Sequence, residues 1–345
     1  MSKRISYKDA GVDIDSADSA KQGMATALES RDPRVLNHLG AFASLFEAKF
    51  PGINEPVLVL KMEEPGSKQK LAIQHDRVEG VCFDLINHLI NDIAVMGATP
   101  LAVLDVIVCG KLEKEIVTRL VKGMSEACRR QSCSLVGGET SEQPRVLPEG
   151  SYILAASVLG VVEKSKIIDG SKIREGDMIL ALASNGLHTN GYSLIRTLLE
   201  SNPELAGQRV GETTFLDAIL EPHLCYLPAL RDLLESEQIK GMAHITGGGI
   251  PGNLNRILPK HLNAEIDGAA IKILPIFKKI RECAGLDDPE MLRTFNLGVG
   301  LCVVCEQSSV SGLIAHFGRH QIKAFEIGRI GKGSGQVEMK GGLSW

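Results

Sequence analysis

The chain has 345 residues, a hydrophobic fraction of 44%, a charged fraction of 23% and a formal net charge of −4. This length predicts roughly two domains, and the composition is that of a globular protein. The weakly acidic charge and an aromatic fraction of only 4% argue against nucleic-acid binding. No apolar run approaches the roughly 20 residues of a membrane span. The polar start of the chain is unlike a secretory signal, so we expect a cytoplasmic protein without a membrane partner.

In the first half of the chain, the spacing of apolar residues predicts helices and strands in mixed order. Helices are expected at 16–29, 33–49, 81–96 and 113–131, and strands at 56–62, 102–108, 133–136 and 152–162. A charged, turn-rich stretch over 163–172 is typical of a domain linker. We therefore expect an N-terminal domain over 1–167 and a C-terminal domain over 168–345.

The second half alternates strands and helices without internal repeats. Strands are expected at 178–183, 242–245, 263–266, 299–304 and 324–330, and helices at 192–200, 226–235, 251–258 and 310–317. The whole pattern predicts an α+β fold with two α/β-sandwich-like domains.

Four glycine-dense segments follow apolar runs, at 137–140, 186–191, 247–249 and 295–300. Glycine allows a left-handed backbone and a close approach to a ligand, and backbone amides near helix starts bind anions. The four segments together predict one phosphate-bearing site assembled from distant parts of the chain. The alternative is four tight turns in a glycine-rich protein.

Acidic side chains suggest a metal site. The helix expected at 81–96 carries a polar stripe that includes Asp84 and Asp92, and Asp105 stands alone in an apolar strand. Glu139 and the Glu63–Glu64 pair supply further carboxylates, and such clusters suit Mg²⁺ bound with substrate phosphates. Surface acids plus one structural aspartate are the alternative.

Three smaller motifs need separate interpretations. His188 lies in a strand-to-helix loop where amides could hold phosphate while the imidazole moves a proton, although a lone loop histidine is often structural. Gly247, Gly249 and Gly252 match a dinucleotide-binding pattern, but the helix that follows is too short for it. Cys302 and Cys305 are expected to be core residues of a strand rather than metal ligands.

Long strings of this sequence resemble phosphoribosylformylglycinamidine cyclo-ligases, also called aminoimidazole ribonucleotide synthetases. They include Leu-Val-Gly-Gly-Glu-Thr at 135–140, His-Thr-Asn-Gly-Tyr-Ser-Leu at 188–194, His-Ile-Thr-Gly-Gly-Gly at 244–249 and Arg-Thr-Phe-Asn-Leu-Gly-Val-Gly at 293–300. The resemblance covers nearly the whole chain in order. It implies a homodimer whose N-terminal domains join their sheets into a β-barrel.

The resemblance also implies a reaction in purine biosynthesis. ATP phosphorylates the formamide oxygen of formylglycinamidine ribonucleotide, and an amidine nitrogen then closes the imidazole ring and expels phosphate. The N-terminal domain would bind ATP and metal and form the dimer, and the C-terminal domain would bind substrate and phosphate. ATP and Mg²⁺ are the implied cofactors.

The family motifs imply roles for individual residues. The implied metal ligands are Glu63, Asp92, Asp105 and Glu139. The implied catalytic residues are His188, Asn190 and Lys68. The implied cofactor-binding residues are Lys8, Asp9, Gly66, Ser67, Gly137, Gly138, Thr140, Gly247, Gly248 and Asn296.

The chain departs from the family pattern in several loops. Residues 63–68 read Glu-Glu-Pro-Gly-Ser-Lys, where the family reads Asp-Gly-Val-Gly-Thr-Lys. Residues 40–43 read Gly-Ala-Phe-Ala in place of the family's glycine-rich turn, and the segment from Gln143 to Arg145 also differs. An active cyclo-ligase is the leading hypothesis. The alternatives are a diverged paralogue with a binding or regulatory role, and a related ATP-dependent synthetase or kinase with another substrate.

Overall fold

The computed structural model describes residues 32–37 and 42–345, and the chain divides into two compact units. The described residues up to Ile90 belong to the first unit with Thr99–Val161, and the second unit contains Asn91–Ala98 and Val162–Trp345. Both units mix helices and strands, which confirms the predicted α+β fold. The helix expected at 16–29, together with Lys8 and Asp9, lies outside the described residues. Within the described ranges, no helix combines the length and apolarity needed to span a membrane.

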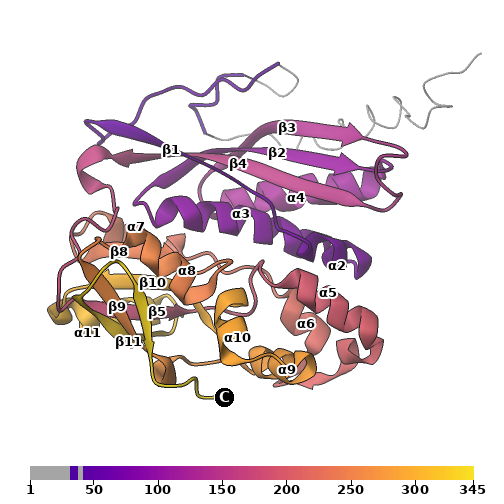
Figure 1. Ribbon diagram of the computed structural model, residues 1–345. Coiled ribbons are helices and arrows are strands. Elements are labelled where there is room, and N and C mark those ends of the chain that lie inside the picture. The colour runs from indigo at the N-terminus through magenta and orange to yellow at the C-terminus, as the bar shows by residue number, and fades with distance from the viewer. Residues whose placement is uncertain (1–31, 38–41) are drawn as a thin grey trace, which may run out of the picture. The chain divides into compact units, whose positions relative to one another are not determined.

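The first unit is built on a four-stranded sheet (Figure 1). Its strands are β1 (Pro56–Glu63), β2 (Thr99–Cys109), β3 (Ser134–Glu142) and β4 (Tyr152–Glu163), in the order β1-β4-β2-β3. Strand β2 pairs in parallel with β3 and antiparallel with β4. The helices are α2 (Lys68–Gln74), α3 (Val78–Ala94) and α4 (Lys114–Arg130), of which α3 and α4 cover one face of the sheet.

The other face of this sheet is apolar and exposed. Residues of β2 that alternate with the exposed Leu104, such as Val103 and Ile107, are fully buried, as expected for a strand with one face on a core. The exposed large side chains on the open face are Leu58, Leu60, Met62, Leu104 and Ile153, with exposed fractions from 41% to 76%. A hollow of about 450 Å³ lies over this face, between Phe46 and Leu60.

Two predictions for the first unit are wrong. The described part of 33–49 is not a helix: Val35 and Phe46 form an antiparallel bridge, and the Asn37 side chain bonds the Ala43 carbonyl and the Leu45 amide. Asparagine bonds of this kind compete with helical bonds. The segment 137–140 is not a turn, because β3 continues through it and pairs residue by residue with β2. Helix α2 was not expected from the sequence.

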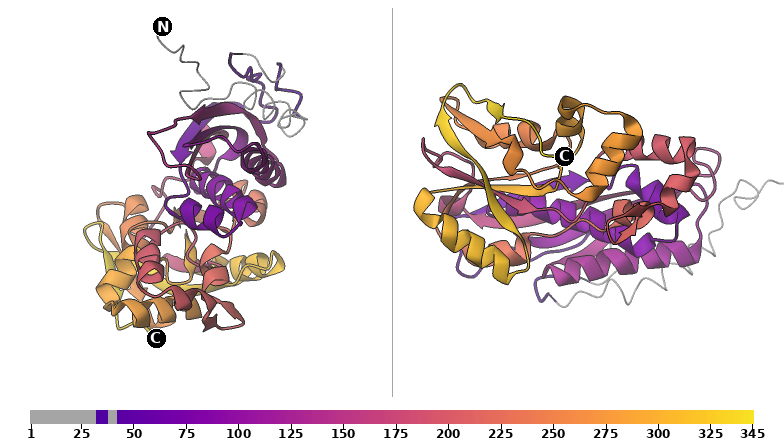
Figure 2. Two further views of the ribbon diagram at one scale, coloured as in Figure 1. Left: turned by 90° about the vertical axis from the view of Figure 1, so that its right-hand side faces the viewer. Right: turned by 90° about the horizontal axis from the view of Figure 1, so that it is seen from below.

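The second unit contains a six-stranded sheet, seen from two further sides in Figure 2. The strands are β5 (Met178–Ala183), β8 (Ile239–His244), β9 (Leu262–Asp267), β10 (Val299–Cys305), β11 (Ala324–Lys332) and β12 (Val337–Lys340), in the order β12-β9-β11-β5-β10-β8. A two-stranded ribbon, β6 (Arg209–Val210) with β7 (Thr213–Thr214), is separate. Every residue of β10 is buried, and Cys302 and Cys305 are free thiols inside it, which confirms their core role.

The helices of the second unit agree with the sequence in part. Those that match predictions are α5 (Tyr192–Ser201), α7 (Leu227–Leu234), α8 (Gly249–Leu254) and α11 (Val310–Arg319). Those not expected are α6 (Phe215–Leu220), α9 (Pro275–Ala284) and α10 (Asp288–Thr294). Strand β8 pairs antiparallel with β10 at the sheet edge and α8 has only six residues, so no βαβ unit surrounds Gly247 and the dinucleotide pattern is excluded.

Candidate functional site

Three of the four glycine-dense segments come together in the second unit. Asn296 joins two of them, because its Nδ2 donates to the Gly186 carbonyl at 2.9 Å and its Oδ1 accepts from the Ser184 hydroxyl at 3.1 Å and the Gly298 amide at 2.9 Å. The third segment is adjacent, since Asn190 Oδ1 lies 3.2 Å from the position that a Cβ on Gly247 would take. The predicted assembly of distant loops therefore holds for 186–191, 247–249 and 295–300. The fourth segment lies in β3 of the first unit.

Two glycines are required by this packing. Gly249 has φ +60°, and a Cβ there would lie 1.8 Å from the Leu292 carbonyl oxygen. Gly191 has φ +83° at the start of α5, and its Cβ would meet the Phe295 ring at 2.2 Å. Both positions combine a left-handed backbone with a contact that leaves no room for a side chain.

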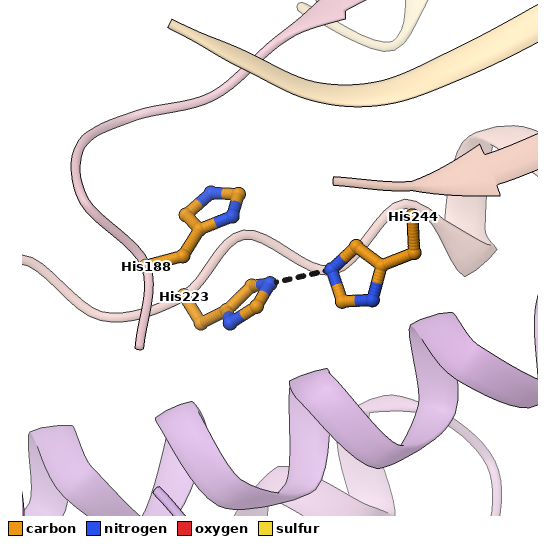
Figure 3. A group of neighbouring side chains, drawn as sticks. All are labelled: His188, His223 and His244. Carbon is orange, nitrogen blue, oxygen red and sulfur yellow. Dashed lines mark hydrogen bonds between the residues drawn. The ribbon is translucent and has the colours of Figure 1, made fainter. Parts of the chain in front are cut away.

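His188 is buried at the centre of these loops and has an unusual backbone. Its exposed fraction is 1% and its φ is +60°, a conformation that non-glycine residues adopt rarely. Its Nε2 lies 3.1 Å from Asn185 Oδ1. Its ring stacks on the ring of His223, with centroids 3.8 Å apart and planes inclined by 19° (Figure 3).

His223 is in turn linked to a carboxylate through a third histidine. His223 Nε2 and His244 Nε2 are 3.0 Å apart, as the dashed line in Figure 3 marks. His244 Nδ1 lies 2.7 Å from Asp92 Oδ1. Asp92 belongs to the last turn of α3, and this turn, from Asn91 onward, is part of the second unit although the rest of the helix belongs to the first. The sequence did not predict the contacts of His223 and His244, because residues so far apart in the chain give no spacing signal.

In the first unit, Lys68 forms a buried ion pair. Its Nζ lies 2.7 Å from Asp84 Oδ1, and the two side chains are 1% and 0% exposed. The preceding Gly66 has φ +59°, and Ser67 stands directly before α2. Glu63 Oε2 lies 3.0 Å from Lys61 Nζ and 3.7 Å from His88 Nε2, whereas Glu64 is exposed. The loop that departs from the family pattern is therefore tied to its own unit at Glu63 and Lys68.

Asp105 and Glu139 do not come together. The register pairs Asp105 with Gly138 and Val106 with Glu139, so the two carboxylates lie on opposite faces of the sheet. Asp105 is on the buried face, where its Oδ1 lies 2.3 Å from the position of a Cβ on Gly138. Burial raises the pKa of Asp105 to about 7. Glu139 is exposed in β3, where Gly137 and Gly138 precede it and Thr140 follows it.

Two domains of one protein family match successive parts of this chain. The N-terminal domain of AIR synthase related proteins matches residues 53–162, and the C-terminal domain of the same proteins matches residues 174–340. The chain therefore belongs to the AIR synthase related family.

Two relatives to which this chain is similar over nearly its full length are both phosphoribosylformylglycinamidine cyclo-ligases. The chain is 42% identical over 339 residues to a phosphoribosylformylglycinamidine cyclo-ligase of Methylobacillus flagellatus, covering 97% of both proteins. It is 41% identical over 328 residues to the cyclo-ligase of Chromobacterium violaceum, covering 94% of this chain and 95% of that protein. The resemblance found in the sequence is thereby confirmed.

Solved structures share the fold at low identity. Thiamine-monophosphate kinase from Stenotrophomonas maltophilia superimposes with a TM-score of 0.68 at 19% identity, covering 94% of this chain and 96% of that one. HypE from E. coli gives a TM-score of 0.67 at 17% identity, covering 94% of each chain. These similarities show the two-unit fold alone.

Proposed function

We propose that this chain is an ATP-dependent cyclo-ligase that closes the imidazole ring of aminoimidazole ribonucleotide from formylglycinamidine ribonucleotide. The observation that carries the proposal is the 42% identity to a cyclo-ligase over 97% of both chains. Solved structures of similar fold include HypE in complex with ATP and T. maritima PurL complexed with AMPPCP, which supports the use of a nucleotide.

In this proposal, the three joined loops of the second unit bind the phosphate-bearing substrate. The amides that open α5 follow Gly191, and a helix start favours an anion. Asn190, partly exposed beside Gly247, would bond the substrate, and His188 would hold or transfer a proton. ATP supplies the phosphoryl group that activates the formamide oxygen. The protein then contributes positioning and charge compensation rather than a nucleophile.

The proposed Mg²⁺ would need ionised carboxylate ligands. Glu63, Asp92 and Glu139 are suitable in type, because their oxygens are hard ligands. Asp105 does not fit together with Glu139, since its side chain is buried and lies on the opposite face of the sheet. A cytoplasmic location and a role for Lys68 toward phosphate stay predictions.

The test is a coupled assay with the purified full chain, ATP, Mg²⁺ and formylglycinamidine ribonucleotide. Ring closure with equimolar release of ADP and phosphate is the expected result. If the protein does not close the ring but uses ATP when another substrate is supplied, the result would support the related kinase or synthetase. A folded protein that binds substrate without turnover would support the diverged paralogue.

Replacing Asp92 by Asn is expected to weaken Mg²⁺-dependent ATP binding by at least about tenfold, an amount equal to about 1.4 kcal/mol. The asparagine oxygen can still accept the bond from His244 Nδ1, so the substitution removes mainly the charge. Glu139→Gln should act in the same way. Calorimetric titration with ATP, with and without Mg²⁺, measures the effect. Asp232→Asn, at an exposed position of α7, is the control and should leave binding unchanged.

The exposed face of the first sheet leads us to propose a homodimer formed through this unit. A patch of Leu58, Leu60 and Met62 beside Leu104 is the kind of surface that oligomers bury. Leu60→Glu should shift the particle in light scattering from the mass of a dimer to that of a monomer, because it places a charge at the centre of the patch. Lys122→Glu, on an exposed position of α4, should leave the mass unchanged. A monomeric wild-type protein at micromolar concentration would refute the dimer.

A further inference from the structure

We propose that His223 is a positioning residue that holds the ring of His188 in the substrate loop, and that His244 and Asp92 hold His223 in turn. The inference rests on the proposed function, in which the loop of His188 acts on the substrate. His223 does not itself touch the reacting atoms in this proposal. Its ring face supports His188, and its ring edge is fixed by a hydrogen bond.

Asp92 orients the ring of His244. An ionised carboxylate only accepts hydrogen bonds, so the contact of 2.7 Å makes His244 Nδ1 the donor. With its single proton on Nδ1, a neutral His244 ring presents Nε2 as an acceptor. The contact of 3.0 Å between His244 Nε2 and His223 Nε2 then requires that His223 carry its proton on Nε2. Asp92 therefore fixes the tautomers of two successive rings.

The backbone around His223 is fixed from the same turn of α3. Asn91, the neighbour of Asp92, donates from Nδ2 to the Leu224 carbonyl at 2.8 Å and accepts at Oδ1 from the Tyr226 amide at 2.9 Å. The Tyr226 hydroxyl donates to the Ala183 carbonyl at 2.8 Å. Both the ring and the chain of His223 are thus held by directional bonds.

The His223 ring in turn supports the ring of His188. The rings are stacked at 3.8 Å, and the Tyr226 ring meets the His188 ring edge-on at 6.3 Å. On β10, Gly300 leaves room for the ring, since a Cβ there would lie 2.7 Å from His188 Cε1. The left-handed backbone of His188 is a sparsely populated conformation that persists only where its surroundings impose it. The stack with His223 is one of those surroundings.

A metal site is the competing interpretation of this cluster. Each of the three histidines offers a ring nitrogen, and these atoms lie within 4.8 Å of one another. A metal ion lies close to the plane of each imidazole that binds it. The planes of His188 and His223 are inclined by only 19° and the ring centroids are 3.8 Å apart, so the two rings cannot direct lone pairs at one ion in this arrangement. The stacked geometry therefore favours positioning over metal binding.

Two substitutions separate the roles of the His223 ring and its N–H group. His223→Phe keeps a flat ring but removes the donor, and His223→Gln keeps a donor but removes the ring. We expect each to lower kcat on the order of 10²-fold, because small displacements of a reacting group have effects of that size. The KM for ATP should stay within about threefold, as expected when ground-state binding is retained. His261→Phe, an exposed histidine of the same unit, should leave both constants unchanged.

Nuclear magnetic resonance of the full chain with ¹⁵N-labelled histidine gives a second measurement that needs no substrate. In chelator at pH 8, the spectra should show His244 protonated at Nδ1 and His223 at Nε2, with each signal assigned by its loss in a single variant. Both His223 variants should shift the ring signals of His188 while their thermal unfolding remains cooperative.

Three results would overturn the proposal: unchanged kcat in both folded variants, the opposite tautomers, or stoichiometric Zn²⁺ binding by the wild type that is lost in His223→Phe. Absence of ring closure by the wild type would instead refute the proposed function. In that case the tautomers and the shift of His188 still decide whether His223 positions it.

Discussion

Replacing Lys68 by Met should lower the free energy of unfolding by about 3–5 kcal/mol, the usual effect of breaking a buried ion pair. The side chains of Lys68 and Asp84 are 1% and 0% exposed, and their charged atoms are 2.7 Å apart. Methionine fills similar space, so the loss comes mainly from the buried carboxylate that loses its cation. Urea denaturation measures the effect. Lys70→Met, at an exposed position of the same helix, should change the free energy of unfolding by less than about 0.5 kcal/mol.

The double variant Lys68→Met with Asp84→Leu tests both roles assigned to Lys68. Removing both charges should restore most of the lost stability, because apolar replacements of a buried pair are often neutral. If Lys68 also contacts the phosphate of ATP, as the family motif implies, the stable double variant should still bind ATP weakly. Normal ATP affinity in that variant would limit Lys68 to a structural role. A single variant as stable as the wild type would contradict the ion-pair prediction.

Asp105→Asn is expected to change how stability depends on pH, by up to about 4 kcal/mol between pH 4 and pH 7. The pKa of the Asp105 carboxyl is raised by burial from 3.8 to about 7 in the folded protein. Below pH 4 the carboxyl is protonated in both states. Between pH 4 and 7 the folded state keeps the proton while the unfolded state releases it, so the wild type loses stability as pH rises. Above pH 7 the contribution no longer changes.

Urea denaturation in chelator from pH 4 to 8 compares wild type and variant directly. The asparagine is close in shape to a protonated aspartate and fits against Gly138, so the curves should agree near pH 4 and diverge toward pH 7, with the variant more stable. Asp232→Asn should give a curve parallel to the wild type. Parallel curves for Asp105→Asn would show that its folded-state pKa is close to the ordinary value.

Periodic segments of the fold were predictable from sequence because one physical pattern determined each of them. Helix α4 and strand β5 have apolar spacing and flanking turns that point to the same structure. The segment 33–49 shows the limit of this reasoning. Its apolar residues are spaced as in a helix, but Asn37 bonds Ala43 and Leu45, and Val35 bridges Phe46 instead. Such local competition is not visible in apolar spacing.

The packing of the loops at the candidate site was predictable where glycine-dense segments occur, and not where contacts depend on topology. The loops of Gly191 and Gly249 were found because glycine-dense segments mark places where the backbone is left-handed or packs closely. Glu139 and Asp105 lie on opposite faces of the sheet because of the register between β2 and β3. The glycines at 137 and 138 suggested a turn there, so this register could not be predicted from the sequence. The contact between His223 and His244 joins residues from separate elements, and no local pattern encodes it.

The three hydrogen bonds of the Asn296 side chain have a consequence for ligand recognition. Two of them, with Ser184 and Gly186, hold the loop before β10 to the loop after β5. The third, from the Gly298 amide, lies within the loop before β10. Loops rich in glycine lose much conformational entropy when they become ordered, and here that loss falls on folding rather than on binding. If these loops bind a phosphate ester, as proposed, we expect its affinity to reflect the contacts it makes, with little deduction for loop ordering. The loops would then act as a rigid binding surface rather than as a lid that closes on its ligand.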